Sequence, residues 1–312
     1  MKKQLKQLLM GLFVMAATIL MAPQVQAKAY GLTQTNPATD SITVSWAAET
    51  NATEYRVYCG LDSQSAGLCA VLQPTQTSVT IGNLAAGQEY FVKVVYDYVT
   101  SYGKTYTDSI VGSAYDFRTI PTQVTGLNQK QWWYFIKKVD VTWDRLPAAD
   151  SYDLEFCNAK GKKIEKKSVT YPSYEHAVNN TMVYTVRVRA NSTICGQNYT
   201  TGWSTAYLFT QPRVKAAKVS GGKLNIKWDK VTGATGYDVY ASTNPKKGYK
   251  KVKSAGKNAT SATAKKLGKT KFNSKKTYYV YVVTKKKTGK TTNTSGALYY
   301  WNTKNKSYSY LN

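Results

Sequence analysis

The chain has few of the residues and motifs on which most enzymes depend. Its 312 residues include one histidine, His176, and no metal-binding spacing surrounds it. A Gly-x-Ser-x-Gly element, a phosphate-binding loop and a cofactor motif are all missing. Because a lone imidazole needs partners before it acts as a base or a ligand, we expect His176 on a surface loop or strand. These absences predict a protein that is not an enzyme, with no cofactor and no metal.

Long apolar runs are also lacking, except at the start of the chain. Residues 1–27 combine a cationic start, an apolar run from Leu8 to Met21 and the small residue Ala27, in the order of a secretory signal peptide. The run is shorter than the roughly 20 residues that span a bilayer, which argues against an uncleaved membrane anchor. We therefore expect a secreted mature chain that begins near Lys28 and has no transmembrane segment.

Helical periodicity is absent after residue 27, and one pattern of alternating strands recurs three times instead. Each copy starts with a strand that ends on a tryptophan: Trp46, Trp143 and Trp228. A tyrosine that opens a second strand follows nine residues later: Tyr55, Tyr152 and Tyr237. Each copy then has a Tyr-x-Val-x-Val strand that begins at Tyr90, Tyr184 or Tyr278. The identical spacing predicts core aromatic residues.

Period-two alternation places apolar and polar side chains on opposite faces of a strand, as in a half-buried antiparallel sheet. Many short strands of this kind predict an all-β chain of three tandem β-sandwiches after the signal peptide. We place the domains at residues 28–120, 121–212 and 213–312. Pro121 and Pro212 interrupt strand pairing near the two boundaries.

The tryptophan, the tyrosine nine residues on and the later Tyr-x-Val-x-Val strand resemble strands B, C and F of the fibronectin type III family. The resemblance covers residues 28–312 and implies seven strands in two sheets for each copy. It also places Tyr90, Tyr184 and Tyr278 near the F-strand corner, where the first copy has Leu84 six residues before its tyrosine. The third copy has Leu267 eleven residues before Tyr278, so we expect an insertion between strands E and F.

The four cysteines of an exported chain are candidates for disulfides. Cys59 and Cys69 lie where strand C and its return strand face each other, and we expect a bond between them. In the topology that the resemblance implies, Cys157 lies late in strand C and Cys195 lies in the F–G loop toward the opposite pole. That offset exceeds the reach of a disulfide unless the loop folds back, so a second bond is doubtful.

Three further tryptophans have no counterpart in the other copies: Trp132, Trp133 and Trp203. They could form an aromatic platform for a sugar ring, or they could pack between the first two domains. We favour the second interpretation, because exposed apolar residues usually mark a contact and a neighbouring domain is the nearest partner.

Acidic residues are almost missing from the last third of the chain. Residues 213–312 contain 24 lysines and arginines against two aspartates, whereas residues 28–212 contain 16 basic and 15 acidic residues. The lysines of interest lie in the C–C′ turn, the E–F region and the F–G hairpin. They are Lys246, Lys247, Lys250, Lys251, Lys265, Lys266, Lys269, Lys271, Lys275, Lys276, Lys285, Lys286, Lys287 and Lys290. We expect the first two groups at one pole of the domain and the hairpin at the other.

A polycationic domain favours contact with polyanions through long-range, salt-screened attraction. Lysines act as point charges and lack the planar fork of arginine, which argues against sequence-specific nucleic-acid binding. The chain has no lipobox cysteine and no Leu-Pro-x-Thr-Gly sorting motif, which are the usual signals for covalent attachment to the cell surface. We therefore expect noncovalent retention on the cell wall.

The sequence therefore predicts a secreted or wall-associated, non-catalytic binding or adhesion protein whose third domain contacts an anionic cell-wall or extracellular polymer. Its first two domains would present a face to a protein or glycan. A passive spacer in an extracellular assembly and a carbohydrate-binding module are the alternatives. The resemblance alone does not decide among them, because one sandwich fold serves spacers, adhesins and receptors.

Overall fold

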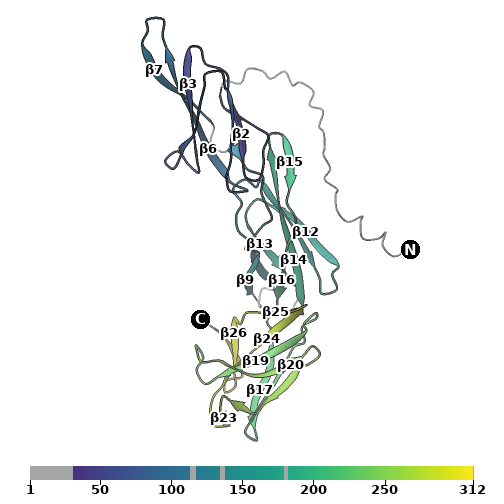
Figure 1. The fold of residues 1–312 in the computed structure, drawn as a ribbon. Helices are drawn as coiled ribbons and strands as arrows, with labels where there is room; N and C mark the ends of the chain where they lie inside the picture. The colour runs from purple at the N-terminus through teal and green to yellow at the C-terminus, as the bar shows by residue number, and fades with distance from the viewer. Residues whose placement is uncertain (1–30, 113–116, 134–137, 179–181, 312) are drawn as a thin grey trace, which may run out of the picture.

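The computed structural model describes residues 31–112, 117–133, 138–178 and 182–311, so the expected signal peptide lies outside the described residues. All regular secondary structure in these segments is β-strand. The strands form three sandwiches that follow one another along a single axis (Figure 1). The all-β prediction is confirmed.

The first domain pairs a three-stranded sheet with a larger one, in the orders β1-β2-β5 and β4-β3-β6-β7. In the larger sheet β8 pairs with the first residues of β6, and β7 pairs with the later part of that strand. Its strands are β1 (Thr33–Thr35), β2 (Ile42–Ser45), β3 (Ala52–Gly60), β4 (Gly67–Leu72), β5 (Ser78–Ile81), β6 (Glu89–Val99), β7 (Thr105–Val111) and β8 (Phe117–Arg118). Buried residues alternate with half-exposed ones along β2, β3 and much of β6, as the period-two pattern predicts.

The second domain repeats this order as β9-β10-β13 and β12-β11-β14-β15, with β16 paired to the first half of β14. Its strands are β9 (Asn128–Trp133), β10 (Lys138–Thr142), β11 (Ser151–Cys157), β12 (Lys163–Val169), β13 (Ser173–Ala177), β14 (Val183–Ile194), β15 (Gln197–Thr200) and β16 (Ser204–Phe209). All of its strand pairs are antiparallel.

The third domain has the orders β17-β18-β21 and β20-β19-β24-β26-β27, with β25 also paired to β24. Its strands are β17 (Val214–Ser220), β18 (Lys223–Trp228), β19 (Gly236–Ser242), β20 (Lys250–Gly256), β21 (Ser261–Ala264), β22 (Lys266–Leu267), β23 (Thr270–Lys271), β24 (Tyr279–Thr288), β25 (Thr291–Thr294), β26 (Tyr299–Asn302) and β27 (Ser307–Tyr310). The small hairpin β22–β23 is the insertion expected between strands E and F.

The repeated tryptophan and tyrosine form the same contact in every core. The two ring centroids lie 5.4, 5.3 and 5.5 Å apart in the first, second and third domains. In each domain the tyrosine hydroxyl also accepts a hydrogen bond from the backbone N–H six residues earlier, at 2.8, 2.9 and 2.8 Å. Trp46, Trp143 and Trp228 are buried. The prediction that these aromatic residues are core residues is confirmed.

The F-strand corner also recurs. The hydroxyl of Tyr90 accepts a hydrogen bond from the N–H of Ala85 at 2.7 Å, and that of Tyr278 from Asn273 at 3.0 Å. In the third domain Phe272, not Leu267, takes the place six residues before the tyrosine. Phe272 is buried, and its ring lies 5.0 Å from that of Tyr278. The inserted hairpin shifts Leu267 out of the corner.

The joint between the first two domains is made by polar contacts. Arg118 forms ion pairs with Asp150 of the second domain at 2.8 Å and with Glu89 of the first at 3.3 Å. The N–H of Ala148 donates to the carbonyl of Gly87 at 3.0 Å. We propose the domain boundary between β8 and β9, at residues 120 and 121.

The joint between the second and third domains is a shared core. Val183 and Phe209 pack with the third domain's buried residues, and Tyr299 packs with those of the second. The side chain of Gln211, 2% exposed, donates to the carbonyl of Tyr299 and accepts from the N–H of Leu298, both at 2.8 Å. We propose the boundary at residues 212 and 213, at the end of a segment in which Thr210, Gln211 and Pro212 are buried.

No helix among the residues described is long and apolar enough to cross a membrane.

Candidate functional site

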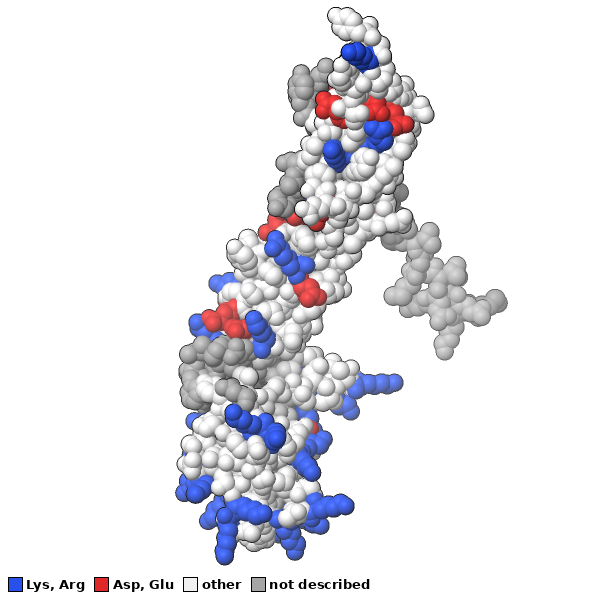
Figure 2. Space-filling model, turned by 90° about the vertical axis from the view of Figure 1, so that its left-hand side faces the viewer, with Lys and Arg blue, Asp and Glu red and all other residues white. Residues whose placement is uncertain are grey.

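Positive charge gathers over the third domain. Figure 2 shows lysine and arginine side chains projecting there, while basic and acidic residues mix over the first two domains. Both acidic residues of the third domain are engaged. Asp229 pairs with Arg213 and Lys215, and Asp238 pairs with Lys251 and Lys285. No other lysine of residues 213–311 forms an ion pair, so most of this charge faces solvent uncompensated.

The structure places the predicted lysines at two ends of this domain. Pairing of Ser242 with Tyr279 brings the β19–β20 turn and the segment before β24 to the end that points away from the second domain. That end, called the distal pole below, carries ten of the predicted residues. They are Lys246, Lys247, Lys250, Lys251, Lys265, Lys266, Lys269, Lys271, Lys275 and Lys276. All ten are exposed.

A hollow in the distal pole brings together lysines that are far apart in sequence. Lys218 on β17, Lys275 and Lys276 before β24, and Lys304 in the β26–β27 turn line a cleft of about 420 Å³. Hydroxyl side chains complete it, among them Thr303, whose Oγ1 accepts the N–H of Tyr278 at 2.9 Å. Ammonium and hydroxyl groups around one hollow suit phosphate or carboxylate oxygens. Lys218 and Lys304 were not among the predicted residues, because only the folded sheet brings them here.

The β24–β25 hairpin is different, because it packs back toward the second domain. Lys285 donates to Asp238 at 2.9 Å, and Lys286 lies over the ring of Tyr207, 5.9 Å from its centroid. Burial alone would raise the pKa of Asp238, but hydrogen bonds from Lys285 and Ser254 lower it on balance. Of the four lysines of this hairpin, Lys287 and Lys290 are exposed, whereas Lys285 and Lys286 are half-buried.

The structure does not assemble the aromatic platform. Gln123 contacts the carbonyl of Trp203 at 2.6 Å, and Gln129 contacts that of Phe209 at 2.9 Å, so the two segments run alongside in parallel. Trp132 lies nine residues beyond Gln123, or roughly 30 Å along an extended strand. Trp132 and Trp133 also lie toward the third domain, which contradicts a position between the first two domains.

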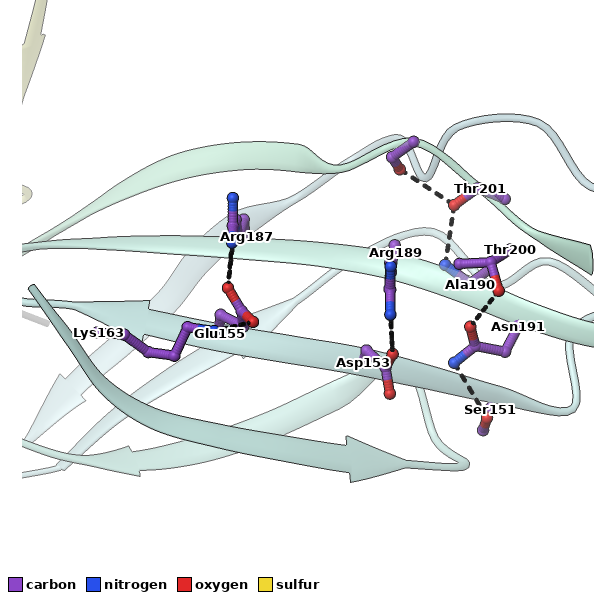
Figure 3. Close-up of polar contacts among 11 residues, drawn as sticks. Ser151, Asp153, Glu155, Lys163, Arg187, Arg189, Ala190, Asn191, Thr200 and Thr201 are labelled. Carbon is purple, nitrogen blue, oxygen red and sulfur yellow. Dashed lines mark hydrogen bonds and ion pairs between the residues drawn. The ribbon is translucent and has the colours of Figure 1, made fainter. Parts of the chain in front are cut away.

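Trp203 is covered by charged side chains. The guanidinium carbons of Arg187 and Arg189 each lie 4.6 Å from its ring centroid. Figure 3 shows these arginines reaching the neighbouring strand, where Arg189 pairs with Asp153 at 2.9 Å and Arg187 with Glu155. The guanidinium groups are attracted to the face of the Trp203 ring by a cation–π interaction. The same two arginines link β14 to β11 through their ion pairs. Trp203 is therefore engaged by its own domain and is not an open sugar platform.

Residues 22–112 match the family model of the fibronectin type III domain. The first domain is a fibronectin type III domain. The second and third share its two-sheet strand order, its tryptophan–tyrosine contact and its tyrosine hydroxyl bond, so the chain is a tandem array of three fibronectin type III-like domains. Such domains are generally binding and scaffold modules of extracellular proteins and are not catalytic.

Two solved structures are similar. One contains the FN1–FN3 domains of chicken CNTN1, with 15% identity over 81% of this chain and 91% of that one, at a TM-score of 0.32. The other is a segment of two fibronectin type III domains from chicken tenascin, with 16% identity, 57% and 97% coverage, and a TM-score of 0.30. No match is found among curated proteins.

All four cysteines are free thiols in this structure. In the first fibronectin type III domain Cys59 and Cys69 nevertheless lie together, with the Sγ of Cys69 4.0 Å from the carbonyl oxygen of Cys59. Burial and the neighbouring Cys69 raise the pKa of Cys59 to about 12. Cys157 pairs with Thr185 of β14 across the sheet, whereas Cys195 follows the end of β14, ten residues beyond Thr185. That is roughly 33 Å of strand, so the second pair is out of reach.

His176 is buried on β13, which corrects its expected surface position. It is 3% exposed and stacks on Phe156, with ring centroids 3.9 Å apart. Its Nδ1 lies 2.5 Å from a carboxylate oxygen of Glu165. Burial lowers the pKa of His176, and Glu165 offsets only part of that effect. Among the described residues no group of three or more His, Cys, Asp or Glu side chains is placed to hold a metal ion.

Proposed function

We propose that this protein is a non-catalytic extracellular binding protein and that its third domain attaches it to an anionic polymer of the cell surface. The observation that supports this proposal is the concentration of exposed lysines at the distal pole, where Lys251 alone of the ten forms an ion pair. Self-repulsion among so many like charges costs stability, and a polyanion would relieve it. The neighbouring domains share the same environment and lack the excess charge.

The kind of charge indicates the kind of ligand. The third domain has 23 lysines and one arginine. Ammonium groups attract repeated phosphates or carboxylates without a demand for planar geometry, whereas reading of nucleic-acid bases usually relies on the arginine fork. A wall polymer with regularly spaced anionic groups, or an extracellular acidic polysaccharide, fits this surface.

The first domain lies at the opposite end of the rod and offers a different surface (Figure 1). Tyr102, at the tip of the β6–β7 hairpin, is 89% exposed, and Tyr98 and Tyr106 stack on each other below it. Leu61, Leu68 and Val71 are exposed on the same domain. Solvent-exposed apolar side chains support a contact with another protein at the first domain. The distal pole would meanwhile attach the molecule to the anionic polymer.

The test is retention of residues 28–312 on isolated Gram-positive cell walls across a salt series. We expect binding at low salt and release as salt rises, because screening shortens the range of the attraction. Lys275→Glu combined with Lys304→Glu should lower the salt concentration of release. Lys287→Glu combined with Lys290→Glu makes the same change in net charge at the β24–β25 hairpin and should lower it less.

Equal effects of the two double variants would mean that overall charge acts and that the distal pole is not a site. Binding by neither the parent nor the variants would favour the spacer function. Deletion of the third domain is a poor control, because the second domain's Val183 and Phe209 would lose the core into which they pack.

A further inference from the structure

A second cleft lies where the second domain meets the third, far from the distal pole. It has a volume of about 500 Å³, within the range of roughly 300–1,000 Å³ of small-ligand sites. One wall comes from the start of β9 and from β16, and the other from β25 and the segment that follows it. Neither domain forms the cleft alone.

The walls are held in fixed positions by the joint itself. Besides the clamp made by Gln211, the hydroxyl of Thr284 donates to the carbonyl of Thr210 at 3.0 Å, and the N–H of Val183 donates to Thr232 at 2.9 Å. The hydroxyls of Tyr207 and Thr288 lie 3.1 Å apart across the joint. A cleft with rigid walls is preorganised, so little ordering entropy opposes binding.

The lining combines free polar groups with an apolar floor. Within the described chain the side chains of Asn128, Thr205, Asn293 and Thr294 line the cleft and make no hydrogen bond with other residues. Leu127, Tyr207, Phe209 and Leu298 add apolar surface. Lys130 is the one charged residue of the lining, and no acidic residue is part of it.

We propose that this cleft binds a short oligosaccharide that carries an acidic group. Amides and hydroxyls both donate and accept, as the hydroxyls of a sugar require. The ring of Tyr207 and the leucines can cover the apolar C–H face of a pyranose, and Lys130 can pair with a carboxylate. The proposal does not depend on the anionic-polymer function, because the two sites use different residues at different ends of the third domain.

The test is calorimetric titration of residues 28–312 with trigalacturonic acid at about physiological salt, which screens nonspecific attraction. Gly296 lines the cleft, no neighbouring heavy atom lies within 4 Å of the place that a Cβ would take there, and its φ is not positive. Gly296→Phe should therefore fill the cleft without backbone strain, and we expect it to weaken binding at least tenfold. Gly82→Phe, at an equally open glycine of the first domain, should leave binding unchanged.

Two further titrations test the chemistry. Neutral cellotriose should bind more weakly than trigalacturonic acid, and Lys130→Met should remove that preference. The inference is wrong if trigalacturonic acid does not bind, if Gly296→Phe binds as the parent does, or if triglutamate binds as tightly. Equal binding of cellotriose would overturn the assignment of an acidic ligand to Lys130. Gly296→Phe should keep the salt-dependent retention on cell walls, so this inference can fail without the proposed function.

Discussion

Tyr55, Tyr152 and Tyr237 each serve two purposes in their domains. The ring packs against the core tryptophan, and the hydroxyl accepts a backbone N–H from the chain that crosses between the sheets. A buried donor that loses its acceptor costs about 1–3 kcal/mol. The tyrosines therefore hold the connection between strands B and C in place as well as filling the core.

Removal of one hydroxyl tests this role. Tyr237→Phe keeps the ring but leaves the N–H of Val231 without its acceptor, so we expect the third domain to lose about 1–3 kcal/mol of stability. Urea unfolding followed by tryptophan fluorescence measures the change. Tyr310→Phe, at an exposed tyrosine, is the control and should change little. A loss equal to that of the control would assign Tyr237 to packing alone.

His176 gives a prediction about pH. Because its pKa is lowered in the folded chain, the unfolded chain takes up the proton first as pH falls through about 6.5, and stability is lost below that value. The groups that face it are Glu165 and the ring of Tyr184. As the chain has one histidine, its imidazole protons give a single NMR titration. A midpoint at or above 6.5 would contradict the prediction.

At the scale of elements, the β3–β4 hairpin brings two cysteines together, and the long strand β14 keeps two others apart. We predict that oxidation bonds Cys59 to Cys69 and never Cys157 to Cys195. Peptide mapping without reduction measures both. The high pKa of Cys59 means that little thiolate is present at neutral pH, so the bond should form faster as pH rises. A peptide that joins Cys157 to Cys195 within one chain would contradict the strand register.

At the scale of the whole molecule, the two joints differ in kind. The first is a set of polar contacts around Arg118, and the second is a shared core closed by Gln211. We therefore expect the second and third domains to move as one body. Such a body would keep the distal pole at a constant distance from the interdomain cleft.

Gln211→Ala tests this rigidity. It leaves the N–H of Leu298 and the carbonyl of Tyr299 without their partner, so we expect a loss of about 1–3 kcal/mol and a wider distribution of interdomain distances. Thermal unfolding and small-angle scattering measure the two effects. Gln64→Ala, at an exposed glutamine of the first domain, should change neither. An unchanged scattering profile would show that the shared core alone holds the joint.

Much of the fold could be predicted because it depends on local patterns. Strand alternation, the spacing of nine residues from Trp228 to Tyr237 and the missing acidic residues of the third domain are all properties of neighbouring positions in the chain. The alternation and the spacing are repeated three times, so they predict the core residues and the inserted hairpin. The shortage of acidic residues extends over the whole third domain, so it predicts the polycationic character. The place of Phe272 was missed because an insertion shifts the spacing on which the prediction relied.

The sequence by itself determined three all-β sandwiches, their aromatic cores and the charge of the last one, because period-two alternation and composition need no long-range information. Only the tertiary structure decided which surfaces exist. Packing buried His176, placed Arg187 and Arg189 over Trp203, and carried Lys218 and Lys304 to the distal pole beside lysines far away in the chain. The interdomain cleft likewise depends on how two domains meet, which is set by contacts between residues far apart in the chain, such as Gln211 and Leu298, which are 87 positions apart.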